Sequence, residues 1–212
     1  MTQGETYHFP EYLADVDALI GALGAPVNLV GHSMGGTIAT MYAGARPDRV
    51  RRVVSIDGLG MPDAGEVAAE RLVQFLDGVA DPPSHKIFPD VATAASRLRR
   101  ANPQIDEAWA LELAVRTTTP VDGGLVWSWD VRHRIRGAIP YRQANHQQLL
   151  RRIACPVLSV RPEHSPFMPA DVGALESTIT NLVTATIRGA GHMVHLDAPS
   201  ELSAVIQDFL AE

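Results

Sequence analysis

The 212-residue chain has a single cysteine, a single lysine and no long apolar run. Cys155 has no second cysteine to pair with, which excludes an intramolecular disulfide, and its place before Pro156 predicts a small buried thiol. Lys86 is the only lysine, so arginine carries the rest of the positive charge. No apolar stretch approaches the ~20 residues of a membrane span, and no basic-then-apolar leader opens the chain. We therefore expect a cytoplasmic protein without a membrane partner.

Basic residues are fewer than acidic ones, with 18 Lys and Arg against 24 Asp and Glu. The net charge is −6 and the pI about 5.7, so nothing electrostatic favours nucleic acid as a partner. Repeats and low-complexity tracts are absent from the sequence. The composition, with 46% hydrophobic and 20% charged residues, is typical of a globular protein. The length of 212 residues is enough for one domain with an insertion.

Helix and strand patterns alternate at both ends of the chain. At the N-terminal end, a helical pattern over 10–23 ends at Gly24 and is followed by an apolar strand, Val27–Val30. A helix closed by Pro47 and a strand over Val53–Ile56 come next. The alternation resumes later, with strands over 157–160 and in "LVTATIRGAGH" and helices over 170–180 and 199–210. This order predicts an α/β fold with a parallel sheet.

The middle of the chain interrupts this alternation. Helical patterns cover 63–79, 89–101, 105–117 and 140–153, and "VDGGLVWSWDVRH" carries the turn signal of a short hairpin. We therefore expect a core made of residues 1–58 and 153–212, with a mainly helical cap or lid insertion at 59–152.

The run "NLVGHSMGGT" places Ser33 between Gly31, two residues before it, and Gly35, two residues after it. A serine hydroxyl is a useful nucleophile only when it is exposed and a base takes its proton. A tight strand-to-helix turn exposes it, and such a turn needs very small residues close to the serine. The backbone N–H of Met34, which opens the helix, would then be placed to stabilise an oxyanion. A glycine-rich turn that serves only packing is the alternative.

A base for this serine should come late in the chain. "GAGHMVHLDAP" follows the last predicted strand, and His192 lies in a loop from which its imidazole could reach Ser33. A core or surface histidine is the alternative for His192. His195 lies three residues further on, but no H-E-x-x-H spacing or carboxylate-rich partner set accompanies the pair. We expect neither a metal nor another cofactor.

Three segments together resemble the α/β-hydrolase superfamily, and within it the capped serine hydrolases and esterases. "LVGHSMGG" is similar to the nucleophile elbow, "RPDRVRRVVSID" to the next helix and strand, and "GAGHMVHLDAPSEL" to the histidine loop and last helix. The resemblance covers the whole chain apart from details of the insertion. It implies a parallel sheet of eight strands, a cap after the sixth, and the chain order nucleophile, acid, histidine.

The position of the elbow departs from the family. There the elbow follows the fifth strand, so roughly 70 residues normally precede it, including a loop that gives a second oxyanion N–H. The resemblance thus implies a core of strands five to eight only. An uncovered edge at Val27–Val30 would invite association. We therefore expect a homo-oligomer or a missing N-terminal segment.

The acid also departs from the family pattern. Family members usually carry it after the strand that follows the cap, and Ser165 stands where that aspartate would fall. A subset places the acid at the end of the strand before the cap, where "VVSIDGLGMP" offers Asp57. We favour Asp57, with Glu163 as the alternative acid. The structural alternative for Asp57 is a cap or turn residue beside Gly58.

These observations favour a serine hydrolase that cleaves a carboxylic ester or related acyl bond of a small molecule through an acyl-enzyme. Cleavage of thioesters, lactones or C–C bonds stays open. His32, Trp127 and Trp129 are candidates for substrate binding, with packing as the alternative for each, and Trp109 is a further candidate for an apolar pocket wall in the cap. The second hypothesis is a catalytically weak or silent hydrolase-like fragment that associates through its exposed sheet edge.

Overall fold

In the computed structural model, which describes residues 7–63, 68–167, 169 and 171–211, four parallel strands form one sheet. Their spatial order is β1-β2-β5-β6. The strands are β1 (Val27–His32), β2 (Val50–Ile56), β5 (Val157–Pro162) and β6 (Leu182–Ile187). The predicted α/β class with a parallel sheet is confirmed.

Apolar side chains alternate between the two faces of the sheet. Val53 of β2 and Val157 of β5 belong to one buried cluster, whereas their neighbours Val54 and Leu158 belong to another. Successive side chains of a strand point to opposite faces, so two clusters require a cover on each side. The apolar runs of β2 and β5 are near-continuous because both faces of these strands are buried.

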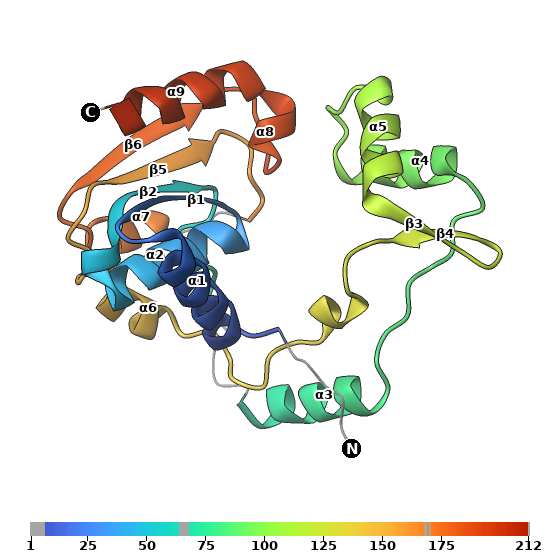
Figure 1. Ribbon diagram of the computed structural model, residues 1–212, viewed down its shortest axis with the longest axis horizontal. Helices are drawn as coiled ribbons and strands as arrows, with labels where there is room; N and C mark the ends of the chain where they lie inside the picture. The colour runs from blue at the N-terminus through green and yellow to red at the C-terminus, as the bar shows by residue number, and fades with distance from the viewer. Residues whose placement is uncertain (1–6, 64–67, 168, 170, 212) are drawn as a thin grey trace. The chain divides into compact units, whose positions relative to one another are not determined.

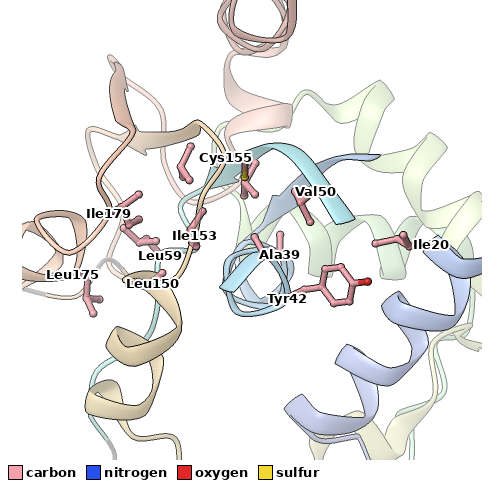
Figure 2. Packing of buried hydrophobic residues seen from close by; sticks show 13 residues of the cluster. Ile20, Ala39, Tyr42, Val50, Leu59, Leu150, Ile153, Cys155, Leu175 and Ile179 are labelled. Carbon is pink, nitrogen blue, oxygen red and sulfur yellow. The ribbon is translucent and has the colours of Figure 1, made fainter. Parts of the chain in front are cut away.

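Helices cover both faces, as Figure 1 shows. The first cluster is buried by helices that include α1 (Phe9–Leu23), α2 (Met34–Ala45), α6 (Gln143–Leu150) and α7 (Val172–Glu176). Figure 2 shows Ile20, Tyr42, Leu150 and other members of this cluster. The second cluster is buried by α8 (Val194–Asp197) and α9 (Pro199–Ala211). A short 3-10 helix, η1 (Pro47–Arg49), links α2 to β2.

The chain divides into two units whose bounds differ from the predicted ones. Among the described residues, the larger unit comprises 8–63, 140–167, 169 and 171–211, and the smaller comprises Tyr7 and 68–139. Residues 140–152, which we expected in the insertion, therefore belong to the larger unit. The reason is apolar burial, because Leu150 is fully buried in the first cluster.

The smaller unit is mainly helical. Its elements are α3 (Ala68–Ala80), α4 (Val91–Ala101), α5 (Glu107–Thr117), the hairpin strands β3 (Thr118–Val121) and β4 (Gly124–Trp127), and the 3-10 helix η2 (Val131–Arg134). Asp90 and Asp106 cap α4 and α5, because their carboxylates accept backbone N–H groups of the first turn. The predicted start of the first of these helices, at 63–67, lies partly outside the described residues.

One helix is shorter than its pattern predicts. We expected a helix around 170–180, and α7 spans only Val172–Glu176, while residue 170 lies outside the described residues. The hydroxyls of Ser177 and Thr178 donate to the carbonyls of Ala174 and Leu175. These bonds satisfy carbonyl groups at the helix end and compete with a further turn.

Strand β1 forms one edge of the sheet. Within the described residues it pairs only with β2, and Val30 on it is 51% exposed. The other edge strand is β6, where Val183 is 52% exposed. No helix in the described part of the chain combines the length and apolarity that crossing a membrane requires.

Candidate active site

Ser33 lies at the turn from β1 into α2. Its backbone has φ 55° and ψ −125°, a conformation that non-glycine residues seldom adopt. The Ser33 N–H donates to the carbonyl of Ile56 at 2.9 Å, which ties the turn to the end of β2. The Ser33 carbonyl accepts from the N–H groups of Gly36 and Thr37, so the helix begins at once after the serine. The sequence motif thus forms the tight strand-to-helix turn that we expected.

The glycines that make this turn possible are not quite the predicted pair. A Cβ at Gly31 would lie 2.2 Å from the carbonyl oxygen of Gly35, and a Cβ at Gly36 would lie 2.6 Å from Ser55 Oγ. A Cβ at Gly58 would lie 2.1 Å from the Ser33 carbonyl oxygen. Nothing lies within 4 Å of the corresponding position at Gly35. The steric demand therefore falls on Gly31, Gly36 and Gly58, and our steric reason for Gly35 was wrong.

Met34 is the first residue of the twelve-residue helix α2, and its backbone N–H has no hydrogen-bond acceptor among the described residues. The first N–H groups of a helix have no partner within the helix, and the helix dipole places partial positive charge there. An anion that forms beside Ser33 would meet this donor.

Asp57 follows β2 directly and reaches the histidine loop. His192 Nδ1–H donates to Asp57 Oδ2 at 2.5 Å, across 135 residues of sequence. The Asp57 side chain is only 1% exposed and that of His192 is 19% exposed. Asp57 has a positive φ of 44°, which aspartate tolerates better than most residues. A carboxylate bonded to Nδ1 leaves Nε2 of the imidazole as the proton acceptor.

Two further bonds hold the histidine loop. His32 Nε2–H donates to the carbonyl of His192 at 2.7 Å, and the two rings lie 4.7 Å apart between centroids. Asp197 Oδ2 accepts the N–H of Gly191 at 2.8 Å. Burial lowers the pKa of His32, and it also lowers that of His195, whose ring lies 5.1 Å from His32. These neighbours thus favour their neutral forms and add little positive charge beside His192.

Glu163, the alternative acid, contacts a different group. Its Oε2 accepts the backbone N–H of Gly189 at 2.8 Å, in the turn after β6, and its side chain is 46% exposed. Its second neighbour is His164, at 3.7 Å. The described contacts therefore bring Asp57, and not Glu163, to His192.

Our reading of the sequence assigned no role to two residues beside the Asp57–His192 pair. Ser165 Oγ–H donates to Asp57 Oδ2 at 2.5 Å, and the Phe167 ring lies 4.6 Å from the His192 ring. In the sequence, Ser165 stands where the family pattern places an aspartate. That position was itself a signal, because a residue there faces the histidine loop.

The tryptophan candidates lie in the smaller unit, and the ring contacts of Trp127 and Trp129 are with residues of that same unit. Trp127 packs edge-on against Phe88, and Trp129 packs edge-on against His85. Trp109 on α5 is 58% exposed. Within the described ranges, no group of three or more His, Cys, Asp or Glu side chains could hold a metal ion.

Comparison with known proteins relates this chain to hydrolases. A family model described as the alpha/beta hydrolase fold matches residues 1–199. A serine hydrolase-like protein of Danio rerio is 29% identical over 96% of this chain and 67% of its own length. The lipase LipV of Mycobacterium tuberculosis is 27% identical over 92% of this chain and 76% of its own.

A solved structure, the thioesterase domain from the curacin biosynthetic pathway, is 36% identical with a TM-score of 0.82. The match covers 95% of this chain and 72% of that one. Because the family model matches residues 1–199 and so spans nearly the whole sequence, the chain belongs to the alpha/beta hydrolase family.

Proposed function

We propose that this protein is a serine hydrolase that cleaves a carboxylic ester or a related acyl bond through an acyl-enzyme intermediate. The observation that carries the proposal is the 2.5 Å bond between His192 Nδ1 and Asp57 Oδ2, beside a strained serine at the neighbouring strand end. The serine hydrolase, lipase and thioesterase names of its relatives support the same class.

In this mechanism Ser33 Oγ attacks the acyl carbon while His192 Nε2 takes the hydroxyl proton. The Asp57 carboxylate holds the imidazole in the working tautomer and stabilises the imidazolium. The Met34 N–H donates to the oxyanion of the tetrahedral intermediate. His192 then gives its proton to the leaving group. In the second half of the reaction His192 Nε2 takes a proton from a water molecule, the water oxygen attacks the acyl carbon, and the Ser33 oxygen leaves as His192 returns the proton to it.

Turnover of a chromogenic short-chain ester tests the proposal. We expect His192→Ala to lower kcat by at least about 10³-fold, because the nucleophile loses its base. Intact-mass measurement after rapid quenching should show the added acyl group on the wild-type chain and none on Ser33→Ala. Ester turnover close to that of the wild type in Ser33→Ala would contradict the assignment.

A second candidate is a weak or silent hydrolase-like module that binds through its sheet edge. The unpaired outer side of β1 and the exposed Val30 favour it. The two candidates differ in one result, because a silent module forms no acyl-enzyme with any activated ester and a weak one forms it far more slowly than an efficient hydrolase does.

A further inference from the structure

Both hydrogen-bond donors to the Asp57 carboxylate meet on one of its oxygens. Ser165 Oγ and His192 Nδ1 each lie 2.5 Å from Oδ2, and each donates its proton to it. The other oxygen, Oδ1, is buried and has no hydrogen-bond partner among the described residues. Within the described residues, the hydrogen bonds that orient this buried carboxylate therefore come from two side chains, and one of them is the histidine that it must orient.

The direction of the Ser165 hydroxyl is itself constrained. The backbone N–H of Phe167 donates to Ser165 Oγ at 3.1 Å. Since a hydroxyl has one proton to give, a lone pair that is already engaged leaves that proton for Asp57. The Phe167 ring meanwhile contacts His192, with 56° between the ring planes. The turn from Ser165 to Phe167 thus touches both members of the pair.

We propose that Ser165 is a positioning residue, whose hydroxyl fixes the rotation of the Asp57 carboxylate so that Oδ2 faces His192 Nδ1. The terminal torsion of an aspartate has a broad energy minimum, so packing alone defines it poorly. Hydrogen bonds to charged groups are stronger than neutral ones. This role rests on the proposed function of Asp57. A hydroxyl that only ties the loop to the core would share the same contact but would not act through the carboxylate.

Steady-state kinetics on the ester substrate separate the two roles. We expect Ser165→Ala to lower kcat about 10- to 100-fold, with KM within about twofold of the wild type. Ser165→Thr keeps the hydroxyl and should recover most of that loss. Ser177→Ala is the matched control, because Ser177 donates to a local helix carbonyl. A kcat for Ser165→Ala within about threefold of the wild type would overturn the proposal.

A double-mutant cycle then asks whether Ser165 acts through Asp57. When Asp57→Asn has already removed the charge, Ser165→Ala should cost less than about twofold further. If the two losses instead multiply, Ser165 has a structural role independent of the carboxylate, and the proposal fails.

Proton NMR gives a readout that needs no turnover. The hydrogen-bonded Nδ1–H of His192 should give a downfield signal that is absent from Asp57→Asn. We expect Ser165→Ala to broaden or remove this signal, and Ser177→Ala to leave it unchanged. If the wild type hydrolyses no ester while Ser165→Ala still removes the signal, the proposed function fails and the positioning role stands. An unchanged signal in Ser165→Ala would overturn the positioning role whatever the turnover.

Discussion

At the residue scale, the neighbouring glycines of the elbow differ in what a methyl group would meet. Gly36→Ala would place a Cβ 2.6 Å from Ser55 Oγ and 3.0 Å from Gly58 Cα, in a buried position. We expect it to lower the free energy of unfolding by about 2 kcal/mol. Gly35→Ala is the matched control, since its Cβ meets nothing within 4 Å and alanine favours helix. Urea unfolding should show Gly35→Ala as stable as the wild type or more so. The reverse order of stability would contradict this account of the turn.

The acid can be tested by two isosteric changes. Asp57→Asn keeps the shape and removes the charge that faces His192 Nδ1, so we expect kcat to fall by about 10⁴-fold. Glu163→Gln changes a carboxylate bonded to the Gly189 N–H, and we expect kcat within about twofold of the wild type. Ester turnover at saturating substrate measures both. The opposite ranking would transfer the role to Glu163.

At the scale of elements, a buried histidine joins α6 to α2. His146 is 1% exposed, and its Nε2–H donates to Thr40 Oγ1 at 3.1 Å, while Tyr141 OH donates to Nδ1 at 2.8 Å. The Thr40 hydroxyl proton is already used on helix carbonyls. Both imidazole nitrogens are therefore satisfied in the neutral form, and burial lowers the pKa of His146 to about 4.

Stability should depend on pH because of this histidine. Between about pH 4 and 6.5 the unfolded chain takes up a proton at His146 that the folded chain does not. The contribution of neutral His146 to the free energy of unfolding should therefore be complete above about pH 6.5. It should be lost as the pH drops towards 4. His146 accounts for a loss of up to about 3 kcal/mol. Urea unfolding of His146→Gln across this range should show a smaller slope with pH. A slope equal to that of the wild type would contradict the prediction.

The strands of the sheet could be predicted because their apolar runs reflect burial on both faces, as at Val53 and Val157. The end of α7 could not, because it depends on hydroxyl bonds of Ser177 and Thr178 that no apolar period reveals. Likewise, α6 was expected in the insertion, since its polar pattern hides the burial of His146 and Leu150.

For the site, the tight turn at Ser33 followed from the glycine spacing, because the local backbone imposes it. The sequence left two candidates for the acid, Asp57 and Glu163. The contact of Asp57 with His192 depends on how two distant strand ends align, and the sequence pattern does not reveal this alignment. The contact of Ser165 with Asp57 joins residues 108 positions apart, and no local pattern encodes it.

At the scale of the whole molecule, the open edge of the sheet predicts self-association. Within the described residues β1 pairs on one side only, and Val30 is half exposed. We expect a second copy to cover this edge, because an uncovered apolar strand is a template for pairing. Sedimentation velocity should show a dimer or larger species whose dissociation constant rises at least tenfold in Val30→Lys. Val183→Lys, on the opposite edge strand β6, should leave association unchanged. A stable monomer at high concentration would contradict the prediction.

Covalent labelling by a fluorophosphonate probe tests the central claim, that Ser33 is a nucleophile activated by His192, most directly. Mass mapping of the labelled chain should find the probe on the peptide that contains Ser33. The label should be absent from Ser33→Ala and should form far more slowly in His192→Ala. Labelling that persists in Ser33→Ala, or a wild-type chain that takes up no probe at all, would contradict the account.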